Sequence, residues 1–168
     1  MKKSYTVDLE KQDLIFSAAH FITFGDNICE SLHGHNYRIR CVVTGELNEH
    51  QFVVDFVALQ QALKNISKSL DHRMLLARDH PTIKVQQGEA EIEVQFEDRR
   101  WVFPLDNCVV LPIGNTTAEQ LAAYIGQKVI ESDCLAAADV ETLEVFVDEN
   151  EGQWGACKFD LSQRSASQ

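Results

Sequence analysis

The sequence lacks any paired cysteine pattern and any long apolar run, and these absences exclude several classes of protein. Its five cysteines are an odd number without a CxxC spacing, which indicates reduced thiols rather than a disulfide framework. No run of about 18 apolar residues is present, so a membrane-spanning helix is not expected. Lys2 and Lys3 are not followed by the apolar segment of a secretory signal. Together these absences predict a cytoplasmic protein.

Positive charge is also scarce. The chain has 15 Lys and Arg residues against 26 Asp and Glu, a formal net charge of −11. This balance argues against non-specific binding to nucleic-acid phosphates. A small polyanionic substrate would still need a local group of Lys and Arg, and Arg38, Arg40, Arg73 and Lys84 are the candidates. The 168 residues are enough for a single domain over residues 1–168 with a core of its own.

Three histidines lie on two predicted β-strands. Residues 4–20 and 35–47 alternate apolar with polar or small side chains, a pattern that predicts strands. His33 and His35 share a face, because residues i and i+2 of a strand point to one side. Antiparallel pairing would add His20. An HxH spacing alone favours an ordinary histidine pair by about two to one, whereas three imidazoles with a free fourth position are typical of catalytic zinc.

The motifs around these histidines decide between the two interpretations. FSAAHF, CESLHGHNY, VVDF and LDHRML follow one another between residues 16 and 76. In this order and spacing they resemble the 6-pyruvoyl-tetrahydropterin synthase and 6-carboxy-tetrahydropterin synthase (QueD-type) family. The resemblance implies a Zn²⁺ ion bound by His20, His33 and His35.

The resemblance also assigns proton transfer. Asp71 and His72 are adjacent in the sequence. An Asp next to a His is more often a pair of polar loop residues than a functional pair. Matched to the family's LDH motif, Asp71 orients or charges His72, which works with Cys29. A cysteine is a useful base only when its thiolate is stabilised, as a nearby metal ion or imidazolium does.

Two helices and two further strands complete the predicted domain. Asp55 is placed to cap a helix over 56–70 whose buried stripe would be Phe56, Leu59, Leu63, Ile66 and Leu70. Thr116 and Glu119 form a capping box for a second helix that runs to about residue 131. That segment also resembles the family's PTxE stretch, which implies that Thr117 and Glu119 help hold a pterin across a subunit boundary. Strands are expected over 143–147 and 154–159.

Glu149 follows the first of these late strands. It stands five residues before Trp154, as the family's pterin-anchoring glutamate stands before its tryptophan. A carboxylate accepts two parallel hydrogen bonds from the 2-amino and N3–H edge of a pterin, which explains the residue type. Its acidic neighbours Asp148 and Glu151 support the alternative, a solvated loop.

The chain departs from the family pattern between residues 77 and 115. Apolar residues alternate on both sides of the EDRR turn at 97–100, which predicts a β-hairpin inserted at about 84–110. We expect it to lie outside the catalytic core, either lengthening a sheet or covering an oligomer interface. Leu76, where the family has Asn, is a second departure.

The predicted fold is α+β. The resemblance implies the tunnelling fold (T-fold), a four-stranded antiparallel sheet with two helices on one face. Trimers of such subunits close a barrel, and two trimers form a homohexamer. Open edge strands would otherwise invite uncontrolled pairing, so oligomerisation is expected on physical grounds too.

Three functions are consistent with these features. The first is a zinc-dependent lyase that converts 7,8-dihydroneopterin triphosphate to 6-carboxy-5,6,7,8-tetrahydropterin in queuosine biosynthesis. The spacing from Cys29 to His33 resembles that bacterial type, so 6-pyruvoyl-tetrahydropterin synthase ranks second. A non-catalytic zinc- or pterin-binding protein is the third.

Glu30 introduces a further hypothesis. An isolated glutamate in a loop is usually solvated. Some relatives carry glutamate in place of the cysteine and resemble enzymes that form 6-hydroxymethyl-7,8-dihydropterin for folate biosynthesis. This chain has both residues, so Cys29 and Glu30 are alternative bases that would select different bonds to break.

Overall fold

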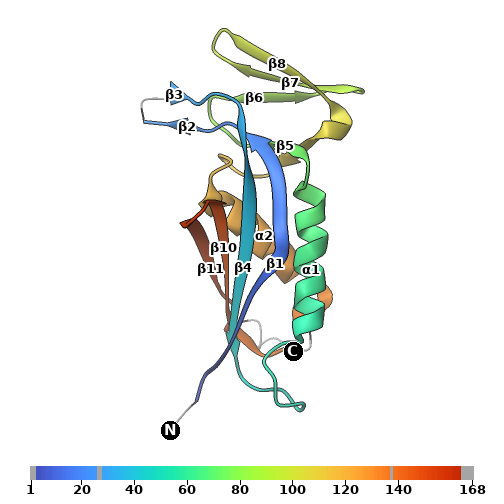
Figure 1. Ribbon diagram of the computed structural model, residues 1–168, viewed down its shortest axis with the longest axis vertical. Coiled ribbons are helices and arrows are strands. Elements are labelled where there is room, and N and C mark those ends of the chain that lie inside the picture. The colour runs from blue at the N-terminus through green and yellow to red at the C-terminus, as the bar shows by residue number, and fades with distance from the viewer. Residues whose placement is uncertain (1–2, 26–27, 137, 164–168) are drawn as a thin grey trace.

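The computed structural model describes residues 3–25, 28–136 and 138–163, and its centre is a six-stranded sheet (Figure 1). The order across the sheet is β11-β10-β4-β1-β5-β9. Its strands are β1 (Tyr5–His20), β4 (His33–Gly45), β5 (Arg73–Ala77), β9 (Cys108–Leu111), β10 (Val140–Asn150) and β11 (Gln153–Asp160). The helices are α1 (Phe56–Leu70) and α2 (Ala118–Glu131), with short 3₁₀ turns η1 (Leu105–Asn107) and η2 (Asp133–Leu135). The predicted α+β class is confirmed.

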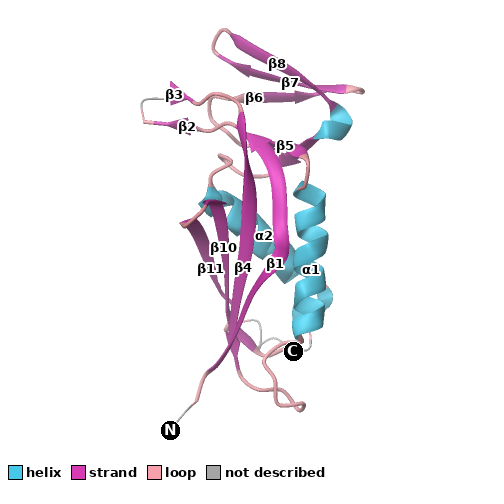
Figure 2. Ribbon diagram, in the orientation of Figure 1, coloured by secondary structure: helices cyan, strands magenta, loops and turns pink. Residues whose placement is uncertain are grey.

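The predicted four antiparallel strands form only part of this sheet. β11, β10, β4 and β1 pair antiparallel, while β5 joins β1 in parallel and β9 joins β5 in parallel. The two extra strands are short and lie beside the point where β1 ends (Figure 2). The sheet is therefore mixed and wider than expected on that side.

The core lies between the sheet and its helices. α1 packs along β1, and α2 packs along β10 and β11 (Figure 2). On β1, Leu14 and Phe16 are buried to 1% exposure or less on the predicted inner face, and Phe16 stacks on Tyr37 of β4 with centroids 4.8 Å apart. Full burial of each such side chain contributes about 1.5–3 kcal/mol. Because His20 continues the Leu14–Phe16 face, the same packing carries it inside.

α1 begins as predicted. The Asp55 carboxylate accepts hydrogen bonds from the amides of Val57 and Ala58, at 2.7 and 3.4 Å, which satisfies two orphan N–H groups of the first turn. The predicted stripe is wrong at its first member, since Phe56 is 54% exposed and lies outside the face that buries Leu59 and Leu63. No helix in the described ranges combines the length and apolar character needed to cross a membrane.

The capping box predicted for α2 is wrong by one residue. Thr117, not Thr116, is the N-cap, and its hydroxyl accepts the amide of Gln120 at 3.5 Å. Thr116 is buried, and its hydroxyl donates to the carbonyl of Phe21 at 3.3 Å. Thr116, which the local pattern predicted as the cap, is therefore used in a tertiary hydrogen bond to Phe21 instead.

The insertion is a separate three-stranded sheet above the main one in Figure 1. It consists of β6 (Lys84–Gln87), β7 (Glu91–Phe96) and β8 (Arg99–Pro104). The β7–β8 hairpin is the predicted one, and Glu97 in its turn has φ 54°. The expectation that the insertion lengthens a sheet holds for its last residues, which form β9 of the main sheet, while β6–β8 form a sheet of their own. That sheet packs in a second apolar cluster: Phe21, Cys29, Met74, Leu76, Ile83, Ile92, Val94 and Phe96.

Candidate metal centre and pterin site

Pairing of β1 with β4 brings the three histidines together. His20 lies directly opposite His33, and His35 lies opposite Ala18. Glycine at residue 34 avoids a tight contact, because a Cβ there would lie 3.0 Å from the Ala18 carbonyl oxygen. The predicted antiparallel approach of the two strands is confirmed, and it places three imidazoles at one end of the sheet.

The imidazoles and one carboxylate form a compact group. Ring centroids are 4.8 Å apart for His20 and His33, 5.2 Å for His20 and His35, and 4.7 Å for His33 and His35. Glu149 of β10 adds an oxygen, Oε1, that lies 3.1 Å from His35 Nε2 and 3.5 Å from His20 Nε2. One candidate ligand atom from each of the four residues lies within 4.8 Å of the others. We call this group the histidine cluster.

Two backbone carbonyls select the nitrogen that each ring offers. His20 Nδ1 lies 2.9 Å from the Thr116 carbonyl oxygen, and His33 Nδ1 lies 2.8 Å from that of Ser31. A carbonyl only accepts, so each Nδ1 carries the proton and each Nε2 keeps a lone pair. This is the usual outer support of a metal-binding histidine.

The inward nitrogens of His20 and His35 face the Glu149 carboxylate but make no hydrogen bond of acceptable geometry among the described residues. His20 Nε2 and His35 Nε2 are buried without a hydrogen-bond partner there, a costly state unless something binds them. Burial also lowers the pKa of His35 and so favours its neutral, ligating form. The histidine cluster therefore fits a metal ion held by three imidazoles.

Glu149 is ionised within this cluster. The pKa of the Glu149 carboxyl group is lowered by the neighbouring imidazoles. His20 has the largest effect, and His35 and His33 add to it. A carboxylate 3.1 Å from His35 Nε2 is close enough to share a metal ion with the imidazoles when no substrate is bound. The sequence assigned Glu149 to the substrate, and the structure brings it to the same spot as the ligands.

Cys29 and Glu30 lie on different sides of their loop. The loop consists of residues 21–25 and 28–32, with β2 (Thr23–Phe24) paired to β3 (Ile28–Cys29), and we call it the base loop. Cys29 is 7% exposed within the second apolar cluster, and burial raises the pKa of its thiol. Glu30 is 39% exposed, with Oε2 3.7 Å from His33 Nε2. The structure thus places Glu30, not Cys29, beside the histidine cluster.

Asp71 and His72 form the predicted pair at the end of α1. Asp71 accepts the Ser17 amide at 2.7 Å, and its other oxygen lies 2.8 Å from His72 Nδ1. The Ser17 amide and His72 together lower the pKa of Asp71, the amide having the larger effect. The His72 side chain is 82% exposed, and its φ of 57° is rare for a non-glycine residue. Asp71 is its ion-pair partner among the described residues.

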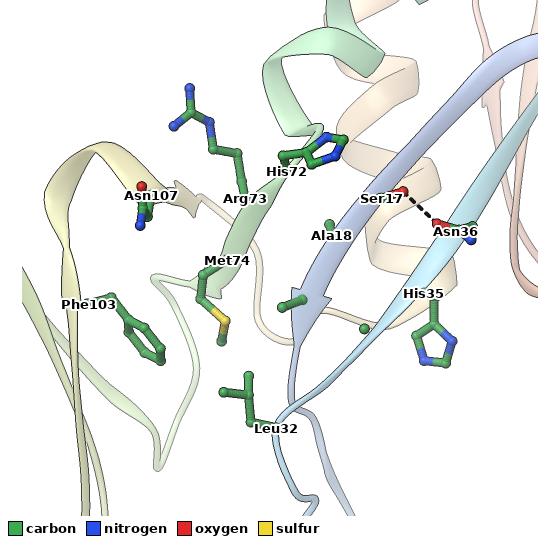
Figure 3. A pocket seen from close by; sticks show the side chains of 12 residues that line it. Ser17, Ala18, Leu32, His35, Asn36, His72, Arg73, Met74, Phe103 and Asn107 are labelled. Carbon is green, nitrogen blue, oxygen red and sulfur yellow. Dashed lines mark hydrogen bonds between the residues drawn. The ribbon is translucent and has the colours of Figure 1, made fainter.

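A pocket of about 610 Å³ is lined by residues of β1, β4 and β5, beside the Asp71–His72 pair (Figure 3). His72 lines it and Phe103 reaches it from the insertion, whereas the ring of His35, another lining residue, points away from the other labelled side chains. Arg73 also lines it, whereas Arg38 and Arg40 are ion-paired with Asp148 and Asp8. Of the four basic candidates, Arg73 is the one that the structure places on the pocket, and Lys84 lies in β6.

Sequence reasoning missed the contributions of Thr116 and Tyr37 to the cluster. Thr116 orients His20 through its carbonyl oxygen, across 96 residues of sequence, and no local pattern announces such a contact. Tyr37 lies edge-on to His20 and His35, with centroids 5.8 and 5.6 Å away. Its position two residues after His35 was the available signal.

The fold and the cluster define an α+β protein with a group of side chains that could hold a metal ion where two antiparallel strands meet. The family model described as 6-pyruvoyl tetrahydropterin synthase matches residues 10–159. The chain therefore belongs to this family of pterin-processing enzymes. The family expectation from the sequence motifs is confirmed.

Relatives and a solved structure agree with this assignment. A Methanocaldococcus jannaschii protein, provisionally named 6-carboxy-5,6,7,8-tetrahydropterin synthase, is 32% identical over 86% of this chain and 88% of its own. A Pyrococcus furiosus dihydroneopterin monophosphate aldolase is 38% identical over 40% of this chain and 57% of its own. A Plasmodium vivax 6-pyruvoyltetrahydropterin synthase, solved with alanine replacing a catalytic glutamate, superposes with TM-score 0.87 at 27% identity, covering 95% and 99% of the two chains.

Proposed function

We propose that the protein is a zinc-dependent lyase of 7,8-dihydroneopterin triphosphate. Its products are 6-carboxy-5,6,7,8-tetrahydropterin and 6-hydroxymethyl-7,8-dihydropterin. The names of the relatives support the first product. The position of Glu30 beside the histidine cluster, with Cys29 buried, is the single observation that favours adding the second.

The histidine cluster is the proposed metal site. His20, His33 and His35 would hold the ion through Nε2, with the fourth position open to substrate. A bound zinc ion supplies Lewis acidity toward the substrate's side-chain hydroxyl groups. The carbonyls of Thr116 and Ser31 keep two of the rings in the ligating tautomer.

Glu30 is the proposed base for the hydroxymethyl product. It removes the proton of a side-chain hydroxyl while the adjacent carbon–carbon bond breaks, and the ring system accepts the electron pair. Glu30 Oε2, 3.7 Å from His33 Nε2, is near enough to reach a substrate held at that ring. The similar Plasmodium vivax protein has a glutamate described as catalytic, which supports this role.

Cys29 is the proposed base for the 6-carboxy product. Its thiol has to leave the apolar cluster to act, because burial keeps it protonated. His72, oriented by Asp71, is the proposed second proton-transfer group, and its exposed side chain lines the pocket.

Glu149, Thr117 and Glu119 are proposed to hold the pterin ring. Glu149 offers an ionised carboxylate at the cluster, while Thr117 and Glu119 lie at the start of α2. We also propose a homohexamer built as a dimer of trimers. β11 and β9 are the outermost strands of the sheet among the described residues, and such edges support pairing with another subunit.

Two other functions compete. The solved neighbours named 6-pyruvoyltetrahydropterin synthase favour that reaction on the same substrate. A protein that binds zinc or pterin without turnover is also consistent with a built metal site.

Product analysis separates these functions. Wild-type protein is incubated with 7,8-dihydroneopterin triphosphate, and the pterins formed are identified by mass spectrometry. Cys29→Ala should keep the hydroxymethyl product, and Glu30→Ala should keep the 6-carboxy product, each losing the other by about two to four orders of magnitude. A wild type that forms no hydroxymethyl product would return Glu30 to a solvated loop residue. Formation of the pyruvoyl product, or no turnover by metal-loaded protein, would favour the competing functions.

A further inference from the structure

The base loop and the inserted sheet share one apolar cluster. Phe21 and Cys29 come from the loop, and Ile92, Val94 and Phe96 come from β7 of the insertion. All five are at most 7% exposed. The loop therefore does not stand free in solvent beside the histidine cluster, because one of its sides is packed against β7.

Arg99 of β8 ties the insertion to the loop directly. Its Nη1 donates to the carbonyl oxygen of Cys29 at 3.3 Å. Its guanidinium lies over the rings of Phe96 and Trp101, 5.0 and 5.8 Å from their centroids, and Trp101 stacks on Phe21 at 4.8 Å. Arg99 of the insertion is thus hydrogen-bonded to the backbone of Cys29. The stack of Trp101 on Phe21 holds the start of the loop against the insertion.

His80 and Asn115 hold the loop at a second point, Thr23. His80 Nδ1 accepts the amides of Thr82 and Ile83 at 3.1 and 2.9 Å. Its Nε2 then carries the proton and donates to Thr23 Oγ1 at 2.8 Å. Asn115 Nδ2 donates to the Thr23 carbonyl oxygen at 3.0 Å. The loop is thereby bonded to the segment before β6 through His80 and to the segment before α2 through Asn115.

These contacts have opposite consequences for Cys29 and Glu30. Side chains of consecutive residues in extended backbone point to opposite sides. With the Cys29 carbonyl bound by Arg99 and its side chain buried in the second apolar cluster, Glu30 faces the His33 ring. Moving the thiol to the histidine cluster requires the loop to leave the insertion.

We propose that the sheet β6–β8 determines specificity: by packing on the base loop it buries the Cys29 thiol and presents Glu30, and so favours the hydroxymethyl product over the 6-carboxy product. This inference rests on the proposed function. It gives the insertion a task within the catalytic site, where the sequence suggested a peripheral one.

The first experiment measures access to the thiol without turnover. Native protein is treated with iodoacetamide, and alkylation at each cysteine is followed by peptide mass spectrometry. Arg99→Ala should raise the Cys29 rate by about tenfold, the factor expected for loss of one hydrogen bond. The neighbouring Arg100→Ala is the control, because Arg100 is exposed and ion-paired with Glu93. Cys41, at 0% exposure in the main core, reports any general loosening.

Thr23→Val provides an independent route to the same result. It removes the acceptor of His80 while keeping the side chain's volume, and thermal melting confirms that each variant is folded. It too should raise Cys29 alkylation selectively. Unchanged Cys29 alkylation in both Arg99→Ala and Thr23→Val would overturn the proposal, as would a wild-type Cys29 that reacts as fast as in denatured protein.

The second experiment measures the product ratio of the same variants. Arg99→Ala should increase the 6-carboxy fraction relative to wild type, and Arg100→Ala should not. Faster alkylation with an unchanged ratio would overturn selection by the insertion while leaving the proposed function intact. A wild type that forms neither product would overturn the proposed function and, with it, the selection.

Discussion

The histidine cluster and the Asp71–His72 pair both combine histidine with carboxylate, but their surroundings suit them to different chemistry. In the histidine cluster, His20 is fully buried and its inward nitrogen has no hydrogen-bond partner among the described residues. In the Asp71–His72 pair, the imidazole is 82% exposed and its carboxylate partner is 2.8 Å away. Burial without a partner prepares a nitrogen to bind a metal ion, whereas exposure with a carboxylate partner prepares a ring to exchange protons. The residue types alone would not distinguish the two.

Replacing a ligand should have the largest effect and would break the first half of this comparison. His35→Ala is expected to weaken metal binding by at least about 100-fold and to abolish both products, and His20→Ala and His33→Ala should do the same. Metal content after gel filtration and competition with a chromophoric chelator measure this. His50→Ala, at an exposed histidine, is the control. Full metal occupancy in the three cluster variants would show that the ligands are assigned wrongly.

Replacing the exposed histidine should separate chemistry from coordination. His72→Ala is expected to slow formation of the 6-carboxy product by about two to four orders of magnitude while metal content stays at the wild-type level. Steady-state rates and metal analysis of one preparation give both values. A variant that loses its metal together with its activity would remove the distinction between the two groupings.

Glu149 sharpens the comparison because it touches the histidine cluster but is assigned to the substrate. Glu149→Gln removes the charge from the proposed hydrogen bonds between Glu149 and the pterin, which contribute about 1.5–3 kcal/mol. KM should therefore rise by about 10- to 100-fold. Metal should remain, since three imidazoles still hold it. Glu151→Gln, on the exposed turn nearby, should match wild type. Metal loss with an unchanged KM would instead make Glu149 a ligand.

The smallest expected effect concerns acid stability at Asp71. The pKa of Asp71 is lowered in the folded protein by the Ser17 amide and His72. Its ionised form therefore stabilises the fold at any pH above the pKa that Asp71 has in the unfolded chain. That contribution is lost as the pH falls through the folded pKa. The Tm of Asp71→Asn should lie about 2 °C below wild type at pH 7, and the gap should close below about pH 3. An Asp106→Asn control should show no such pattern, and a gap that persists at low pH would contradict this account.

Much of the framework was predictable because it depends on local patterns. Alternation along β1 and β4 gave the strands and the shared face of His33 and His35. The Asp55 cap and apolar spacing located α1 to the residue. Prediction from short-range patterns was wrong where a distant contact competed. Thr116 was expected to cap α2, but its hydroxyl bonds to the Phe21 carbonyl and Thr117 is the cap.

The sequence by itself determined the α+β class, the family and the residue types of the histidine cluster, because periodicity and motif spacing are properties of neighbouring residues. Only the tertiary structure decided how Cys29 and Glu30 differ. They are adjacent in the chain, yet packing in one cluster with β7 and β8, more than 60 residues away, buries one and leaves the other 3.7 Å from His33 Nε2. Burial and the approach of distant strands depend on the whole chain, so no local pattern could have predicted that outcome.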